Sequence, residues 1–186
     1  MKNPLILIVG MPGSGKSFAA QALKKHLSTK VVETGDIVRE EIKSRGWKYT
    51  PETSKKIRHY FHSGRENLII KRAWDKIKKS NRKVRVIVGF RCLKEVEILR
   101  KHFKGKIVII AIKAPFKIRA ERERKRKRFG KSESLEYLKK RDKDEIRIGE
   151  KSLIDHADYS ISNSNITKTQ TEASIVKLVK KIIKQA

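Results

Sequence analysis

The chain has 186 residues, which fits one compact domain, and it is strongly basic. Its 48 Lys and Arg residues outnumber 20 Asp and Glu residues and give a formal net charge of +28. A charge of this size repels itself unless anions are close, so phosphorylated substrates, nucleic acid or an anionic membrane face are candidate partners. The single cysteine, Cys92, excludes an internal disulfide and a cysteine-based zinc site, and it favours a reducing compartment.

The first apolar run, Leu5–Val9, is too short for the apolar part of a signal peptide or for a transmembrane helix. No later apolar run reaches the length of a transmembrane helix either. We therefore expect a cytoplasmic protein that does not span a membrane.

Short apolar runs rich in Val and Ile, separated by segments of helical periodicity, predict an α/β fold with a parallel sheet. The runs do not alternate between apolar and polar residues, as expected of strands that are buried on both faces. They are Leu5–Val9, Val31–Val32 with its neighbours, Val84–Phe90, Ile107–Ile112 and a weaker run at Tyr159–Ile161.

Helices are predicted between these strands. Ser17–Leu27 carries apolar residues at helical spacing, and a second helix is expected to start at Pro51 with Thr50 as its N-cap. Gly64 interrupts that helical pattern, and Thr171–Ile183 forms the last helix. We expect a core at about 1–36, 81–118 and 151–186, with helical inserts at about 37–80 and 119–150.

The sequence GMPGSGKS at residues 10–17 fits the phosphate-binding P-loop pattern, with a buried-type strand before it and an amphipathic helix after it. Glycines let the backbone wrap closely, so that main-chain N–H groups point at phosphate oxygens. Lys16 is expected to contact the β- and γ-phosphates, and the Ser17 hydroxyl is expected to ligate Mg²⁺. The predicted nucleotide-binding residues are Gly10, Gly13, Ser14, Gly15, Lys16 and Ser17.

A carboxylate, Asp36, follows the second predicted strand within the sequence Thr-Gly-Asp. Because ligands of open parallel sheets bind beyond the carboxyl ends of the strands, Asp36 is a candidate for two roles. It would accept a proton from an acceptor hydroxyl or hold a water molecule bound to Mg²⁺. Arg39, about one turn later, would reach an acceptor phosphate. The alternative is that Asp36 only caps a helix that begins at Ile37.

The third predicted strand ends in Val88-Gly-Phe-Arg91. An arginine that follows a glycine at the end of a strand can hold a phosphate with two hydrogen bonds, although a plain surface arginine remains the alternative. Further along, Lys117–Lys131 is a basic tract in which Arg119, Arg122 and Arg126 share one helical face. Such a tract would neutralise a transferring phosphoryl group, or it would be a solvated charge run.

Together these motifs resemble adenylate-kinase-like P-loop kinases, and most closely an archaeal group related to nucleoside monophosphate kinases and dephospho-CoA kinases. The resemblance spans nearly the whole chain and rests on GMPGSGKS, TGDIVREE, GFR-x-x-x-E-V-E and APFKIRAER. It implies a P-loop NTPase fold with a five-stranded parallel sheet, a monophosphate-binding insert at about 37–80 and an Arg-rich lid at about 119–150.

The resemblance also implies roles for individual residues. Arg39 and Arg91 would hold the acceptor phosphate, and Asn163 would lie near the donor adenine. The lid arginines that close on the transferring group would be Arg122, Arg126 and Arg141. One position departs from the family, because Val88 stands where related proteins carry an aspartate that anchors Mg²⁺. Asp36 would then carry that role, Mg²⁺ would be held through water, or catalysis would be impaired.

These observations predict an ATP- and Mg²⁺-dependent phosphotransferase that acts on a small phosphorylated substrate, such as a nucleoside monophosphate, or on a dephospho-CoA-like hydroxyl. The alternative is an ATP-binding protein that keeps the kinase fold and associates with RNA or the ribosome through its basic surface. A weaker third reading is an NTPase that transfers the phosphoryl group to water.

Overall fold

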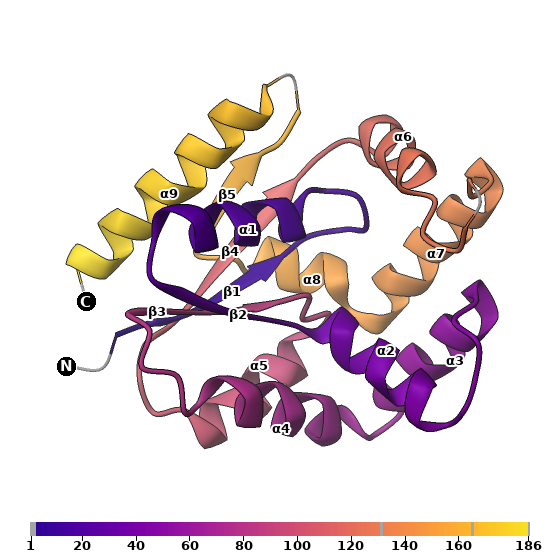
Figure 1. Cartoon of the computed structure of the whole chain (residues 1–186), viewed down its shortest axis with the longest axis horizontal. Helices are drawn as coiled ribbons and strands as arrows, with labels where there is room; N and C mark the ends of the chain where they lie inside the picture. Colours follow the sequence, from indigo (N-terminus) through magenta and orange to yellow (C-terminus); the bar gives the residue numbers. More distant parts are fainter. Residues whose placement is uncertain (1–2, 131, 165, 186) are drawn as a thin grey trace.

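The computed structural model describes residues 3–130, 132–164 and 166–185, and its centre is a five-stranded parallel sheet (Figure 1). The strand order β2-β3-β1-β4-β5 confirms the predicted fold class. Every pair of neighbouring strands is parallel, and β1 is buried along its whole length, which explains why its sequence lacks alternation. The strands are β1 (Leu5–Val9), β2 (Thr29–Glu33), β3 (Val84–Val88), β4 (Ile107–Lys113) and β5 (Tyr159–Ser162).

Two helices, α1 (Lys16–His26) and α9 (Lys168–Lys184), cover one face of the sheet (Figure 1). Because side chains alternate along a strand, Ile6 and Ile8 of β1 point to this face. They pack with Leu23 of α1 and with the buried side of α9. The apolar residues whose spacing predicts the last helix are therefore those that contact the sheet. The helix begins earlier than expected, at Lys168.

The opposite face is covered by a larger group of helices, and Leu5, Leu7 and Val9 of β1 point into it. The helices that contribute to this layer are α2 (Thr34–Ser44), α3 (Pro51–Phe61), α4 (Glu66–Ile77), α5 (Leu93–His102) and α8 (Glu150–Asp155). Figure 1 shows α4 and α5 side by side below the sheet, with α3 further out.

The segment predicted as an acceptor-binding insert contains α3, α4 and most of α2. The predicted start of α3 is confirmed: the Thr50 hydroxyl accepts a hydrogen bond from the Thr53 N–H at 3.2 Å, with Pro51 as the first helical residue. The helix α4 is part of the main core, because Ile69, Ile70, Ala73 and Ile77 are buried against the sheet layer. The helix α3 joins the same core through Ile57 and Phe61, although it lies further out (Figure 1).

The segment predicted as a lid contains α6 (Phe116–Arg126) and α7 (Leu135–Ile148). Arg119 is buried between them, where it pairs with Asp142 of α7 at 2.6 Å and donates to the Pro12 carbonyl at 3.0 Å. These bonds hold both helices against the P-loop. Lys131, the last residue of the predicted basic tract, lies outside the described residues. Within the described ranges, no helix is both long and apolar enough to cross a membrane.

Candidate functional site

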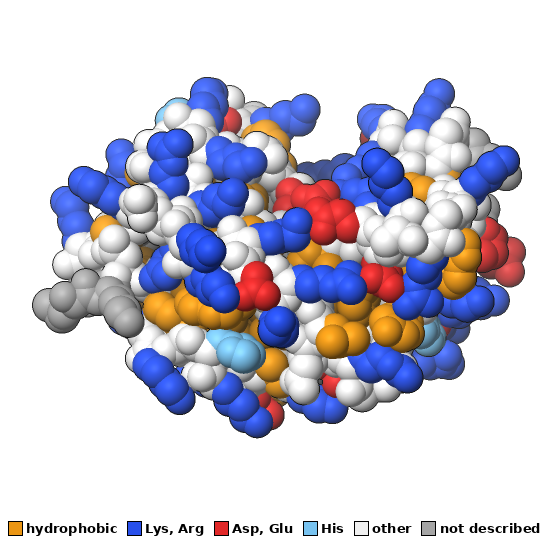
Figure 2. Space-filling view, turned by 60° about the horizontal axis from the view of Figure 1, so that its bottom comes forward, with side chains coloured by type: hydrophobic (Ala, Val, Ile, Leu, Met, Phe, Trp, Pro, Cys, Tyr) orange, Lys and Arg blue, Asp and Glu red, His pale blue; other side chains and the backbone are white. Residues whose placement is uncertain are grey.

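A cleft of about 260 Å³ lies at the carboxyl ends of β1, β2 and β3, where the P-loop meets α6, α7 and α8. Charged side chains dominate its lining. Figure 2 shows Lys and Arg side chains spread over the visible face, and a hollow between two projecting parts has such side chains at its base. The polar and charged lining includes Ser14, Lys16, Ser17, Glu33, Thr34, Arg39, Arg91, Arg122, Glu123, Arg126, Arg128, Arg141, Glu145 and Glu150.

The P-loop is held tightly by its surroundings, and two glycines show how closely. A side chain at Gly15, where φ is +105°, would meet the Asn163 Nδ2 atom at 2.2 Å. A side chain at Gly13 would meet the Arg119 carbonyl oxygen at 2.5 Å. Among the described side chains none caps α1, so the N–H groups of its first turn, at the edge of the cleft, depend on another acceptor. An anion is the natural partner of such a helix start.

Lys16 lies inside the cleft and contacts two oxygen atoms. Its Nζ donates to the Gly10 carbonyl and lies 3.4 Å from Glu150 Oε1. Burial lowers the pKa of Lys16, and the Glu150 carboxylate offsets only part of that effect. A bound polyphosphate would supply the negative charge that this buried ammonium lacks.

The sequence reasoning missed Glu33, the last residue of β2. The Ser17 hydroxyl donates a hydrogen bond of 2.8 Å to Glu33 Oε2. In the sheet Glu33 is level with Val88, the position at which the resemblance described above implies an aspartate. In this protein the carboxylate at that level of the sheet is therefore on β2, the strand next to β3. Its position at the carboxyl end of the strand was the signal that could have identified it.

Asp36 does not line the cleft. The helix that contains it begins at Thr34 and not at Ile37, because Thr34 turns inward and donates to the Gly89 carbonyl at 2.8 Å. Asp36 thus lies in the first turn of α2, its side chain is 56% exposed, and it pairs with Arg39. Of the two residues, only Arg39 belongs to the lining of the cleft.

Arg91 lies on the wall opposite the P-loop, within a buried set of ion pairs. Its Nε donates to Glu145 of α7 at 2.8 Å, and Arg58 of α3 lies 3.4 Å from the same carboxylate. Burial alone would raise the pKa of Glu145, but the charges of Arg91, Arg58 and Arg141 outweigh it and hold the pKa at about 2. This carboxylate is therefore ionised and joins α3, α7 and the loop after β3.

The remaining arginines of the lid gather on Glu123. Arg141 donates to its carboxylate at 2.7 Å, Arg128 lies at 3.1 Å and Arg126 at 3.8 Å. Burial works to raise the pKa of Glu123, yet these cations lower it. The predicted lid residues Arg126 and Arg141 thus come together in the cleft. Arg128 of the basic tract, which helical spacing places off the face shared by Arg119, Arg122 and Arg126, also lines the cleft, and Glu123 was not predicted.

Arg122 and Asn163, two further predicted site residues, hold the backbone of the P-loop. The Asn163 amide donates to the Ser14 carbonyl at 2.7 Å. Arg122 donates to the same carbonyl at 3.3 Å and to the Asn163 carbonyl at 3.0 Å. Asn163 is outside the lining of the cleft, whereas Arg122 belongs to it. In this structure both residues therefore hold the P-loop backbone in its conformation.

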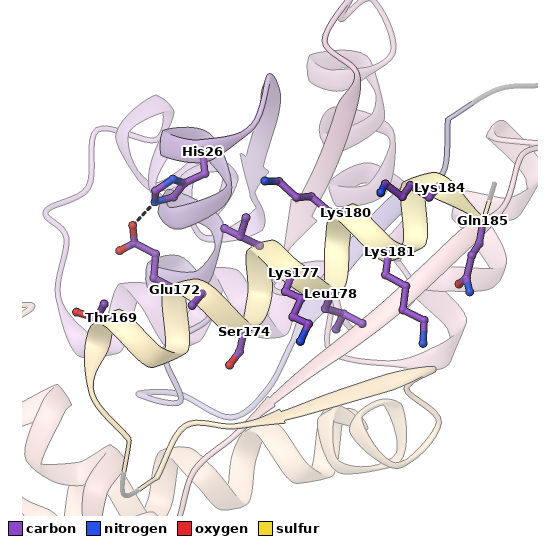
Figure 3. Close-up of a pocket in the computed structure, with 12 residues that line it drawn as sticks. His26, Thr169, Glu172, Ser174, Lys177, Leu178, Lys180, Lys181, Lys184 and Gln185 are labelled. Atoms are coloured by element: carbon purple, nitrogen blue, oxygen red, sulfur yellow. Dashed lines mark hydrogen bonds and ion pairs between the residues drawn. The ribbon is translucent and has the colours of Figure 1, made fainter.

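A second, open hollow of about 1180 Å³ runs along α9 and shares no described lining residue with the cleft. Figure 3 shows Lys177, Lys180, Lys181 and Lys184 projecting from this helix. At the other end of the helix Glu172 pairs with His26. The lysine spacing of i, i+3, i+4 and i+7 forms a basic stripe on one helical face.

Comparison with known families agrees with this fold. The family model of the AAA domain matches residues 9–139. A UPF0200 protein of Thermococcus onnurineus is 37% identical over 184 residues, covering 96% of this chain and 98% of the relative. A UPF0200 protein of Pyrococcus abyssi is 40% identical over 166 residues, covering 87% and 88%.

Two solved kinases share the overall fold. The shikimate kinase of Acinetobacter baumannii, solved in complex with shikimate, superimposes with a TM-score of 0.65 at 16% identity, covering 96% of this chain and 93% of that one. A gluconokinase of Sinorhizobium meliloti gives 0.57 at 15% identity, covering 100% and 98%. At such identities the likeness extends to the fold alone.

Proposed function

This chain belongs to the UPF0200 family of archaeal P-loop proteins, and on that premise we propose that it transfers the γ-phosphoryl group of ATP to a small acceptor. The acceptor is a nucleoside monophosphate or a molecule with a dephospho-CoA-like hydroxyl. One observation carries the proposal. The uncapped start of α1 and the Lys16 ammonium line the same cleft as the arginines of the opposite wall.

The donor side of the cleft fits a triphosphate with Mg²⁺. The first-turn N–H groups of α1 would bind the phosphates, and Ser14 Oγ is a buried hydroxyl for which the structure shows no hydrogen-bond partner. Ser17 and Glu33 present hard oxygen donors side by side, which suits Mg²⁺ bound partly through water. The metal would neutralise charge on the transferring group, and Glu33 takes over the role first expected of Asp36.

The acceptor side is formed by arginines that come from separate elements. Arg39 of α2 and Arg91 after β3 would bind the anionic part of the acceptor, and Arg126 would approach the transferring group from α6. Phosphoryl transfer depends mainly on positioning and on neutralising charge. A cleft bounded by α6 and α7 would also exclude water, which competes as an acceptor.

The test is a coupled assay of ADP release with ATP and Mg²⁺ against AMP, CMP, GMP, UMP, dephospho-CoA, shikimate and gluconate. We expect at least one acceptor to raise ADP release well above the rate with water alone, and Lys16→Ala to abolish the increase. ADP release that no acceptor accelerates would contradict the proposal.

A second candidate function, RNA binding, is favoured by the α9 stripe. None of its four lysines forms an ion pair with a described residue, whereas most arginines of the cleft are paired with carboxylates. Lysines that recur once per helical turn can neutralise phosphates of a nucleic acid backbone without reading its sequence. On this proposal α9 would bind RNA on the side of the sheet that α1 also covers.

The stripe is tested by measuring the binding of single-stranded RNA across a salt series. A plot of the logarithm of the RNA association constant against the logarithm of the salt concentration has a negative slope. Replacing Lys177, Lys180, Lys181 and Lys184 with Gln is expected to make this slope shallower by about 3, since each lost phosphate contact removes about 0.7. The control replaces four exposed lysines elsewhere, at Lys79, Lys83, Lys104 and Lys106. Equal slopes for the two quadruple variants would show that α9 is not the RNA-binding surface.

A further inference from the structure

Four carboxylates line the cleft, and three of them are already committed to close partners. Glu33 accepts a hydrogen bond from Ser17 at 2.8 Å. Glu123 is paired with Arg141 at 2.7 Å, and Glu145 with Arg91 at 2.8 Å. Arginines compensate the charges of Glu123 and Glu145 at hydrogen-bonding distance, whereas Glu33 is held by a neutral hydroxyl and is assigned above to Mg²⁺. A carboxylate that arginines stabilise as an anion is a weak base, so Glu123 and Glu145 are poorly suited to accept a proton, and Glu33 is occupied by the role proposed for it at Mg²⁺.

Glu150, the fourth carboxylate, has a different environment. The structure gives it one ion-pair partner among the described residues, Lys16 Nζ, at the longer distance of 3.4 Å. Its position is fixed by Gly149, where φ is +118° and an added side chain would meet the Cys92 Cβ at 3.0 Å. This sharp corner between α7 and α8 packs against the loop after β3. It places Glu150 within 3.4 Å of the P-loop lysine and in the same cleft as Arg91, which is assigned above to the acceptor.

The protonation of Glu150 also differs from that of its neighbours. Burial is the largest cause of its raised pKa, and the nearby negative charge of Glu145 adds to it. Lys16 from α1 and Arg91 from the loop after β3 act in the opposite direction but do not cancel these effects. In contrast, the pKa values of Glu123 and Glu145 are lowered by their arginines. A carboxylate with a raised pKa is a stronger base than its neighbours.

We propose that Glu150 is the general base that deprotonates the acceptor, and that the acceptor is therefore an alcohol that also carries an anionic group. This inference rests on the phosphotransferase function proposed above. The anionic group would bind Arg39 and Arg91, and the alcohol would lie between Glu150 and the γ-phosphate. The product is a phosphate ester.

The chemistry of the acceptor explains why a base matters. A phosphate oxygen of a nucleoside monophosphate is already an anion near neutral pH and has no proton to lose when it attacks. An alcohol keeps its proton until it reacts, so its attack releases a proton that must be accepted. A cleft that served only phosphate acceptors would need no base beside Lys16.

The alcohol oxygen forms a bond to the γ-phosphorus while the bond from that phosphorus to the β–γ bridging oxygen breaks. The electron pair of the broken bond leaves with ADP, and the hydroxyl proton moves to the Glu150 carboxylate. Binding of the triphosphate draws Lys16 towards the phosphates, which frees the carboxylate to act. The proton passes to solvent after the products leave.

The test combines the acceptor panel with the variant Glu150→Gln, which keeps the shape of the side chain and removes its basicity. We expect turnover with hydroxyl acceptors, an ester product by ³¹P NMR, and a fall in kcat of about 10²–10⁴-fold in the variant. In the wild type kcat should fall at acidic pH as Glu150 becomes protonated, and this fall should be absent in Glu150→Gln. Glu150→Asp, which keeps a carboxylate, should retain the fall at a reduced rate. The control Glu121→Gln changes an exposed carboxylate of α6 outside the cleft and should leave kcat unchanged.

Three results would overturn the inference. If the product is a phosphoanhydride formed on a nucleoside monophosphate and Glu150→Gln leaves kcat unchanged, the phosphotransferase function stands and Glu150 is not the base. If Glu150→Gln alters only the KM for ATP and keeps the fall of kcat at acidic pH, Glu150 merely pairs with Lys16. If wild-type protein binds ATP but turns over no acceptor of either class, the proposed function itself fails. Thermal unfolding of each variant verifies that it is folded.

Discussion

The two walls of the cleft are built in different ways. The P-loop wall comes from eight consecutive residues, and its chemistry resides in backbone N–H groups, Lys16 and Ser17. The opposite wall is assembled from α3, α6, α7, α8 and the loop after β3, and its chemistry resides in buried ion pairs around Glu123 and Glu145. Local sequence therefore specifies the first wall, whereas tertiary packing specifies the second.

This difference has a consequence for stability. The backbone N–H groups at the start of α1 have no side-chain cap among the described residues, so they can bind water or an anion without leaving a buried charge uncompensated. In the opposite wall, removal of one carboxylate leaves several buried arginines without compensation. Substitutions in the P-loop wall should thus affect function most, and substitutions in the ion-pair wall should affect folding as well.

The largest expected effect is on catalysis at the P-loop wall. Lys16→Ala removes the cation for the β- and γ-phosphates and should lower the rate of phosphoryl transfer about 10³-fold, with little change in the free energy of unfolding. Steady-state rates and denaturant unfolding measure the two quantities. Lys24→Ala, an exposed lysine on the same helix, is the control and should match the wild type. A large loss of stability in Lys16→Ala would contradict the expectation that substitutions in the P-loop wall affect mainly function.

In the opposite wall, Glu145→Gln should reduce stability by about 3 kcal/mol, because Arg91, Arg58 and Arg141 lose their common counter-charge. Urea unfolding followed by circular dichroism measures the change. Glu97→Gln replaces an exposed carboxylate of α5 and should change stability by less than about 0.5 kcal/mol. Similar unfolding midpoints for these two variants would show that the ion pairs around Glu145 do not hold the wall together.

The same carboxylate gives a pH dependence with a defined sign. The pKa of Glu145 is about 2 in the folded protein and 4.5 in its reference state, so folding favours the ionised form. Its contribution to stability is fully present above about pH 4.5 and is lost as the pH falls from there towards 2. The unfolding free energy of the wild type should fall more steeply across this range than that of Glu145→Gln. Parallel curves would contradict the assignment.

A smaller effect is expected at the edge between the walls. Glu33→Gln should raise the Mg²⁺ concentration needed for half-maximal activity about 10- to 100-fold, because a neutral amide is a weaker metal partner than a carboxylate. Glu40→Gln on the exposed side of α2 serves as the control. Asp36→Asn is measured in the same assay. If it raises the required Mg²⁺ concentration more than Glu33→Gln does, Asp36 and not Glu33 is the metal partner.

The parts of the molecule that could be read from the sequence are those with local signals. Apolar runs located the strands, Thr50 and Pro51 located the start of α3, and glycine spacing located the P-loop. Asp36 shows the limit of this reasoning. Whether a carboxylate after β2 faces the cleft depends on where α2 begins, which the contact between Thr34 and Gly89 decides. Such contacts join residues that are distant in the chain.

The ion-pair wall shows the same limit more strongly. In a chain with 48 Lys and Arg residues, sequence spacing cannot tell which arginines are buried. Arg58 was not predicted, and folding brings it to Glu145. Arg128 belongs to the predicted basic tract, but helical spacing places it away from the cleft, and folding nevertheless brings it to Glu123. Glu150 became a candidate base only by contrast with these paired carboxylates.

The central claim is that main-chain N–H groups at the start of α1 bind a polyphosphate. Hydrogen exchange of the amides of residues 13–17, measured by NMR with and without a non-hydrolysable ATP analogue and Mg²⁺, tests it most directly. The account predicts that these amides become markedly slower to exchange when the analogue is added, while those of the α9 stripe do not change. Unchanged exchange in this segment at saturating analogue would contradict it.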